Sequence, residues 1–171
     1  MRWIVLLYGN DVIDTEIMGV KSDRITRGHR FHTDGTLAIS EPTQYEALLE
    51  THGKVIPNFA KRKDMIIEQV KTATENYGQA IMEPSLLDEV TALVEWPVVL
   101  VGKFEEHFLD VPQEALISTM QDNQKYFPIV DKDGNLTRYF CFVSNIESEN
   151  PQEVISGNER VIRPRFSDAD F

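Results

Sequence analysis

Three residues that can contact phosphate, Arg27, His29 and Arg30, surround Gly28 near the start of the chain. Guanidinium groups form paired hydrogen bonds with phosphate oxygens, and a glycine lets the backbone come close to a ligand. The pattern therefore predicts a local contact with the phosphates of a nucleic acid. The alternative interpretation is that this basic loop pairs with Asp and Glu side chains across a domain interface.

A second candidate set is the segment Gln124–Pro128, in which Gln124 and Lys125 adjoin Tyr126 and Phe127. Aromatic faces and amide groups recognise unpaired RNA bases, which makes this segment a candidate for stacking on a base. Alternatively, the two rings close the hydrophobic core while Lys125 reaches solvent along its aliphatic stem.

A third candidate set lies near the other end of the chain and contains Asn158, Arg160 and Arg163. On a helix the two arginines share a face, whereas Asn158, two positions before Arg160, points away from it. Part of this set is therefore expected to pack against a following domain. The candidate RNA ligands from all three sets are Arg27, His29, Arg30, Lys125, Arg160 and Arg163.

The residues that could hold a metal or perform catalysis form weaker patterns. His29 and His32 have a spacing that suits a metal pair, but no third ligand is evident nearby, so no metal site is predicted. Asp88 and Glu89 point in different directions on a helix, and for Glu95 a structural role as a hydrogen-bond acceptor is favoured. No glycine-rich phosphate loop, nucleophile elbow or histidine-bearing triad is visible, so no catalytic residue is predicted.

The charge balance restricts where a nucleic acid could bind. The chain has 171 residues, 42% of them hydrophobic, and a formal net charge of -11. It is long enough to bury a core, but an acidic protein is a poor general binder of phosphate. Any RNA contact must therefore be local. Two stretches are basic although the chain as a whole is acidic, and these are Lys21–His32 and Asn158–Phe166.

Targeting and redox signals are few. The apolar runs Ile4–Leu7 and Pro97–Val101 are far shorter than the roughly 20 residues of a membrane span, and no signal peptide is recognisable. We therefore expect a cytoplasmic protein with no membrane contact. Cys141 is the single cysteine, which excludes an internal disulfide and predicts a buried, unreactive core thiol.

The positions of glycine and proline, together with the periodicity of apolar residues, predict the secondary-structure elements of the first third of the chain. In order, these are a buried strand over 3–9, a turn at 9–11, a second strand over 12–18 completing a hairpin, a basic loop with some extended structure over 21–34, a short apolar stretch over 37–39, a helix over 42–51 stopped by Gly53, and a short strand at Val55–Ile56.

The remaining elements follow from the same signals. They are a helix over 58–77 ended by Gly78, a helix over 85–96 with Ser85 as its cap, a strand over 98–101 buried on both faces and closed by Gly102, a helix from Pro112, a hairpin of strands 127–130 and 136–143 around Asp133-Gly134, and a helical segment over 149–171 interrupted at Gly157 and Pro164. The order predicts a mixed α/β (α+β) fold with a largely antiparallel sheet and packed helices.

The domain expected from this order is a mixed α/β core over residues 1–148, followed by a helical extension over 149–171 that leads into a further domain. The chain ends on Phe171 without the polar tail of a natural terminus. We therefore expect it to be a piece of a longer protein.

Four phrases of this sequence resemble those of the bacterial glycyl-tRNA synthetase beta subunit. They occur in that family's order, are spread over nearly the whole chain, and cover Thr26–Phe31, Leu87–Pro97, Gln124–Pro128 and Gly157–Arg163. The resemblance implies an internal fragment from the middle of the subunit, upstream of a helical His-Asp region and of the anticodon-binding part. It also implies a remote similarity to the editing-type domain of the phenylalanyl-tRNA synthetase beta subunit.

The same resemblance implies a partner and a reaction. The family's enzyme has two alpha and two beta subunits and joins glycine to tRNA(Gly) with ATP and magnesium, and the alpha subunit carries the class II catalytic core. The fragment is then expected to be a noncatalytic structural and tRNA-binding module that binds no cofactor and contacts the alpha subunit and the other beta-subunit domains. The alternatives are an editing-type hydrolase acting on mischarged tRNA and a pure subunit-docking domain.

Overall fold

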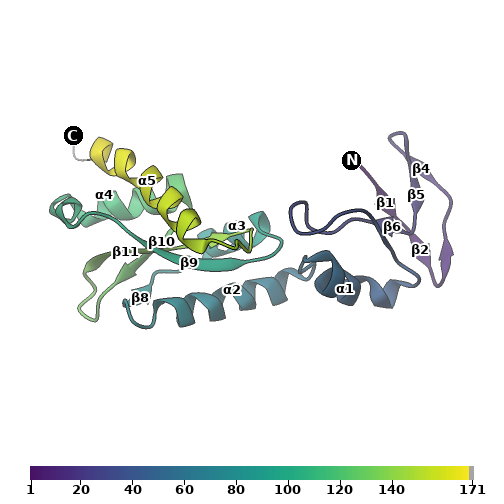
Figure 1. Cartoon of the computed structure of the whole chain (residues 1–171), viewed down its shortest axis with the longest axis horizontal. Helices are drawn as coiled ribbons and strands as arrows, with labels where there is room; N and C mark the ends of the chain where they lie inside the picture. The colour runs from purple at the N-terminus through teal and green to yellow at the C-terminus, as the bar shows by residue number, and fades with distance from the viewer. Residues whose placement is uncertain (170–171) are drawn as a thin grey trace. The chain divides into compact units, whose positions relative to one another are not determined.

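The computed structural model describes residues 1–169, so the last two residues of the predicted C-terminal helix lie outside it. The chain divides into two compact units, Met1–Phe59 and the residues from Ala60 onward. The segment predicted as one core domain, 1–148, thus contains all of the first unit and part of the second. Each unit combines helices with largely antiparallel strands, which confirms the predicted mixed α+β class (Figure 1).

The first unit consists of short strands followed by one irregular helix. Its strands are β1 (Ile4–Val5), β2 (Leu7–Tyr8), β3 (Asp11–Val12), β4 (Glu16–Ile17), β5 (Val20–Asp23), β6 (Ile25–Thr26) and β7 (Leu37–Ala38). They form a three-stranded sheet in the order β1-β5-β4 and two separate pairs, β2-β3 and β6-β7. β1 runs parallel to β5, and the other pairs are antiparallel.

The N-terminal hairpin is confirmed only where Leu7 pairs with Val12 and Tyr8 with Asp11, because the strand predicted over 12–18 is broken and Glu16–Ile17 pairs with β5 instead. The predicted burial of the first strand is wrong, because Trp3 is 42% and Tyr8 81% exposed. A sheet of two or three short strands covers only part of its own side chains, so aromatic residues on it stay in contact with solvent.

The helix after β7 is longer and less regular than predicted. It starts as a 3₁₀ turn, η1 (Pro42–Gln44), continues as α1 (Tyr45–Leu48) and ends in a π-helical turn, η2 (Leu49–Gly53). Gly53 does not stop it, because the left-handed residue is Lys54, with φ 52°. The predicted strand Val55–Ile56 is also wrong: the Val55 N–H bonds to the Leu49 carbonyl at 3.1 Å and closes the helix end instead of joining a ladder.

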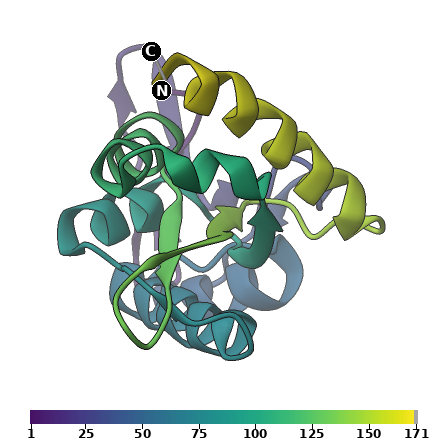
Figure 2. The same cartoon turned by 90° about the vertical axis from the view of Figure 1, so that its left-hand side faces the viewer.

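The second unit is a four-stranded antiparallel sheet with helices on both faces. Its strands, in the order β8-β10-β11-β9, are β8 (Gln79–Ala80), β10 (Phe127–Val130), β11 (Leu136–Ser144) and β9 (Val98–Lys103). Its helices are α2 (Phe59–Thr74), α3 (Pro84–Leu93), η3 (Glu106–Asp110), α4 (Gln113–Ser118), the π-helical η4 (Thr119–Gln124) and α5 (Pro151–Ala169). α4 and α5 lie on one side of the sheet and α2 on the other (Figures 1 and 2).

Alternation along β11 divides the core of this unit into two layers, because successive strand residues point to opposite faces. Phe140 and Phe142 are buried with Ile162 and Phe166 of α5, whereas Cys141 is buried with residues of α2 and α3. The predicted core position of Cys141 is confirmed, and burial raises the pKa of its thiol to about 12.

Two predicted elements are confirmed with small changes. α2 covers most of the segment 58–77, and the β10-β11 hairpin forms around Gly134, with Phe127 opposite Cys141. α3 is capped by Glu83 instead of Ser85, since a Glu83 carboxylate oxygen accepts from the Leu86 N–H at 2.9 Å. α3 also ends at Leu93, three residues earlier than predicted.

Three interpretations of Gly and Pro as breakers, at Gly102, Gly157 and Pro164, are wrong. β9 does not close at Gly102 but continues through it, partly buried along most of its length, and the ring of Phe140 covers the glycine. The C-terminal helix is not interrupted, because α5 runs from Pro151 to Ala169 with Pro164 inside it. Fully buried Ile162 and Phe166 flank the proline, and their packing compensates for the missing backbone donor.

Candidate functional site

The basic loop between β6 and β7 is built around a buried histidine. The side chain of His29 is only 1% exposed. The backbone N–H of His29 donates to the Gly53 carbonyl at 2.6 Å. The backbone carbonyl of His29 accepts from the N–H of Thr33 at 3.1 Å and from its hydroxyl at 2.9 Å. The ring Nδ1 accepts from the Phe31 N–H at 3.2 Å. His29 therefore fixes the backbone on both sides of Arg30.

Gly28 holds the same loop against the end of η2. A Cβ added at Gly28 would lie 2.5 Å from the Gly53 carbonyl oxygen and 2.5 Å from the Thr33 hydroxyl. Real Cβ atoms do not approach other atoms this closely, so no other residue fits without moving the backbone. Gly28 thus allows the loop and the end of η2 to come into close contact.

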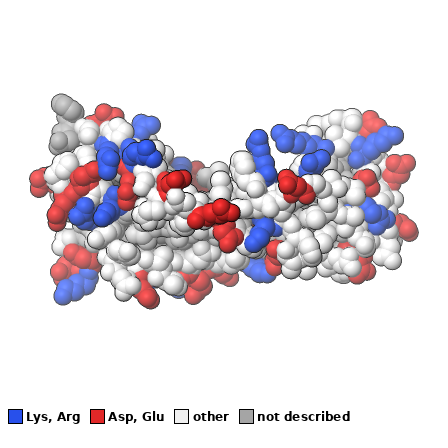
Figure 3. Space-filling view, viewed as in Figure 1, with Lys and Arg blue, Asp and Glu red and all other residues white. Residues whose placement is uncertain are grey.

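Arg27 and Arg30 are exposed on this fixed loop. Within residues 1–169 neither side chain forms an ion pair, and Arg30 lies over the ring of Phe31 at 5.5 Å from its centroid. The neighbouring Arg24 differs, because it donates to the carbonyls of Asn10, Ile39 and Ser40. In Figure 3, Lys and Arg side chains gather along one edge of the first unit.

The rings of His29 and His32, whose spacing suits a metal pair, lie 4.5 Å apart and are tilted by 36°. In the part of the chain that the structure describes, no group of three His, Cys, Asp or Glu side chains could hold a metal ion. His29 acts in the loop through its backbone and Nδ1 contacts, and its ring presents almost no surface to solvent.

The second unit brings part of the Gln124–Pro128 set together with one member of the third set, Asn158, in a groove of about 310 Å³. Lys125 and Tyr126 line it with Asn158, and the Tyr126 hydroxyl donates to Asn158 Oδ1 at 2.6 Å. Burial raises the pKa of Tyr126 to about 12. Lys125 adopts a left-handed backbone conformation, φ 59°, and its Nζ pairs with Glu89 Oε1 at 3.2 Å.

The two arginines of the third set are directed elsewhere. Arg160 donates to the carbonyl of Ser156 in its own helix at 3.3 Å. Arg163 forms an ion pair with Glu105, and the second carboxylate oxygen of Glu105 is buried with no hydrogen-bond partner among residues 1–169. Arg163 therefore connects α5 to the start of η3.

The carboxylates do not converge on one site. Asp88 pairs with Lys63 at 2.6 Å, and Glu89 with Lys125. Desolvation by burial lowers the pKa of the Arg62 guanidinium, and the negative charge of Glu95 offsets part of that shift.

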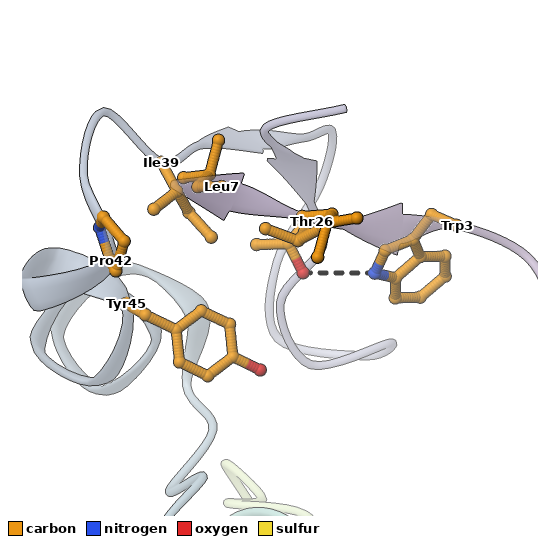
Figure 4. Close-up of a pocket in the computed structure, with 8 residues that line it drawn as sticks. Trp3, Leu7, Thr26, Ile39, Pro42 and Tyr45 are labelled. Atoms are coloured by element: carbon orange, nitrogen blue, oxygen red, sulfur yellow. Dashed lines mark hydrogen bonds between the residues drawn. The ribbon is translucent and has the colours of Figure 1, made fainter. Parts of the chain in front are cut away.

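Sequence reasoning missed a pocket of about 500 Å³ in the first unit. Figure 4 labels six of its lining residues, which lie in or directly beside β1, β2, β6, β7, η1 and α1: Trp3, Leu7, Thr26, Ile39, Pro42 and Tyr45. Trp3 Nε1 donates to Thr26 Oγ1 at 3.1 Å. Because these residues are far apart in the sequence, no local pattern indicates the pocket. The one residue that could have indicated the pocket is Trp3, but the sequence pattern predicts a buried strand over 3–9 that includes it.

A family model described as the glycyl-tRNA synthetase beta subunit matches residues 1–171. Relatives with the name glycine–tRNA ligase beta subunit include one from Psychromonas ingrahamii, 57% identical over 98% of this chain and 25% of its own length. Those from Stutzerimonas stutzeri and Proteus mirabilis are 55% and 53% identical over 99% and 98% of this chain. The chain spans about a quarter of the length of these relatives.

These similarities relate the chain to the subunits of aminoacyl-tRNA synthetases. The chain belongs to the glycyl-tRNA synthetase beta subunit family. The middle position within the subunit and the remote similarity to the editing-type domain stay predictions. Over residues 1–169, no helix is both long and apolar enough to cross a membrane.

Proposed function

We propose that this chain is a noncatalytic structural and tRNA-binding module that supports the ATP-dependent attachment of glycine to tRNA(Gly). Arg27 and Arg30 are the phosphate contacts in this proposal. The observation that carries it is that both are exposed, have no acidic partner within residues 1–169, and lie on a loop fixed by Gly28 and His29. A fixed loop loses little conformational entropy on binding, so its cations are preorganised for phosphate.

The other candidates contribute less in this proposal. Lys125 and Arg163 would have to exchange an existing carboxylate partner for phosphate, which offsets much of the gain. Arg160, in contrast, is exposed and bonded only to a carbonyl of its own helix, so it is available as a secondary contact. The net charge of -11 limits tRNA contact to such basic patches.

The proposal includes partners that lie outside this chain. The alpha subunit carries the bond-making step and uses ATP with magnesium, in the cytoplasm, whereas this chain binds no cofactor. The remaining beta-subunit domains hold the module in place. Its candidate contacts with tRNA are cations spread over several elements, and no set of converging acid and base groups accompanies them within residues 1–169. This favours binding over hydrolysis.

Removing both loop cations tests the proposal. We expect Arg27→Ala with Arg30→Ala, made in the whole enzyme, to weaken tRNA(Gly) binding about tenfold or more and to reduce the slope of log affinity against log salt by about 1.5 to 2. Lys71→Ala with Lys132→Ala removes the same charge from exposed positions of the second unit and serves as the matched control. Equal effects of the two pairs, or an unchanged salt slope, would contradict the assignment.

The noncatalytic part of the proposal has its own test. The 171-residue chain and the intact enzyme are incubated with alanyl-tRNA(Gly), and release of alanine is measured. We expect no deacylation by the chain above the rate in buffer. Turnover by the chain alone would support the editing alternative. Capture of the alpha subunit by a chain that binds no tRNA would support the pure docking alternative.

A further inference from the structure

Two pockets in the first unit share one hydrogen-bonded pair of lining residues. The apolar pocket of about 500 Å³ and a smaller pocket of about 220 Å³ are both lined by Trp3 and Thr26. The Trp3 indole N–H donates to Thr26 Oγ1 at 3.1 Å, as Figure 4 shows. The bonded pair is therefore a shared wall between the two spaces.

The larger pocket has the features of an aromatic stacking site. Trp3 and Tyr45 line it and are 42% and 40% exposed, so each ring has surface left for a ligand. Ile39 is 1% exposed and forms apolar wall beside them, and Figure 4 shows the Tyr45 ring extending from α1 toward the strands. The volume lies within the range of about 300 to 1,000 Å³ that is usual for small-molecule pockets.

The hydrogen bond to Thr26 restricts the orientation of the indole. The one polar group of the Trp3 ring is already satisfied within the protein, so its remaining exposed surface is aromatic. A ligand with a flat π face and polar edges matches this wall better than an aliphatic chain, because it stacks on the ring and keeps its edges near solvent.

The smaller pocket has the opposite character. Arg2, Lys21 and Arg27 line it together with Asp23. The Asp23 carboxylate accepts from the N–H of Arg24 at 2.7 Å, which occupies one of its oxygens. Three cations against one acid favour a phosphate in this space.

We propose that the first unit binds one unpaired nucleotide of an RNA strand, with the base in the aromatic pocket beside Trp3 and Tyr45 and a phosphate in the basic pocket beside Lys21 and Arg27. Thr26 fixes the distance between the two parts, since it bonds Trp3 and directly precedes Arg27 in the chain. This inference rests on the proposed tRNA binding and adds that the module recognises a single-stranded nucleotide.

Tryptophan fluorescence provides a direct readout. The chain has two tryptophans, so Trp96→Phe leaves Trp3 as its single emitter. We expect a short single-stranded oligoadenylate to quench or shift this emission in a saturable manner. A matched oligonucleotide of abasic sugar-phosphate units should bind about tenfold more weakly and leave the emission unchanged, because it keeps the phosphates and lacks the stacking face.

Substitutions separate the aromatic contribution from folding. Trp3→Ala and Tyr45→Ala should each weaken oligoadenylate binding about tenfold, measured by anisotropy of a labelled oligonucleotide. Trp3→Phe should restore part of the affinity, because it retains a ring. Tyr8→Ala is the control, since Tyr8 is 81% exposed in the same unit and lines neither pocket.

The possible failures are distinguishable. If the abasic and base-containing oligonucleotides bind equally, and binding still depends on Arg27 and Arg30, the stacking site is refuted while tRNA binding through the loop stands. If the intact enzyme lacking both loop arginines binds tRNA(Gly) normally, the proposed function fails as well. Quenching by an apolar peptide but not by oligoadenylate would overturn the nucleotide assignment.

Discussion

The hydroxyl of Tyr126 lies 2.6 Å from Oδ1 of Asn158 and joins the start of the β10-β11 hairpin to the middle of α5. The same tyrosine stacks on Phe140, with 4.8 Å between the ring centroids. Asn158 in turn donates to the carbonyl of Val154 one helical turn earlier. Two phrases by which the sequence resembles its family are thus in direct contact in the fold.

Removing this hydroxyl should cost stability. Tyr126→Phe keeps the stacked ring but leaves Asn158 Oδ1 without its donor, so we expect the free energy of unfolding to fall by about 1 kcal/mol. Urea denaturation of the variant, of Asn158→Ala and of the double variant measures the coupling between the two side chains. Strictly additive losses would show that the hydrogen bond contributes nothing beyond each residue alone.

The contact between Gly28 and Gly53 leads to a second prediction. Gly28→Ala places a methyl group about 2.5 Å from the Gly53 carbonyl oxygen, so the loop or η2 must move. We expect a loss of about 1 to 3 kcal/mol in unfolding free energy. tRNA(Gly) binding by the whole enzyme should weaken although no charge has changed. Normal stability together with normal binding would mean that the loop conformation is not needed.

The buried thiol predicts how stability responds to alkaline pH. Burial raises the pKa of Cys141 from 9.0 to about 12, so the folded chain holds this proton in a pH range where the unfolded chain has lost it. The contribution is fully present below pH 9 and is lost as pH rises toward 12, at a rate on the order of 1 kcal/mol per pH unit.

Urea denaturation between pH 8 and 11 checks this dependence, with Cys141→Ala as the comparison. The variant should lose less stability over this range than the parent. Tyr126, whose pKa is raised from 10.0 to about 12, contributes in the same direction at the upper end in both proteins. An identical slope for parent and variant would exclude a role for the thiol.

Local signals explain which parts of the fold the sequence predicts. The Asp133-Gly134 turn and the apolar spacing of α2 are encoded within a few residues, and both elements form where expected. The same local rules interpret Gly53 and Pro164 as helix breakers. The conformation at Gly53 depends on its contact with Gly28, and the helix continues through Pro164 because α5 packs on the core, and neither contact is local in sequence.

The candidate site shows the same limit more clearly. The sequence grouped Asn158 with Arg160 and Arg163 because they are neighbours along one helix. In the structure Asn158 faces Tyr126, 32 positions away, and the two arginines bond elsewhere. The aromatic pocket gives no local signal for the same reason, since Trp3 and Tyr45 line one pocket only after the strands of the first unit have paired. By contrast, the basic loop was recognisable because its cations are consecutive.

A last prediction concerns Gly157, which lies inside α5 with no atom within 4 Å of the place where a Cβ would be. A glycine in a helix interior is less favourable than alanine by about 0.5 to 1 kcal/mol, because its unfolded backbone has more freedom to lose. Gly157→Ala should therefore raise the free energy of unfolding by that amount. Tyr126 and Asn158 need no rearrangement, so the hydrogen bond between them should persist. A destabilised variant would show that α5 requires a flexible residue here, and would favour an interface in the whole subunit that approaches its backbone at this position.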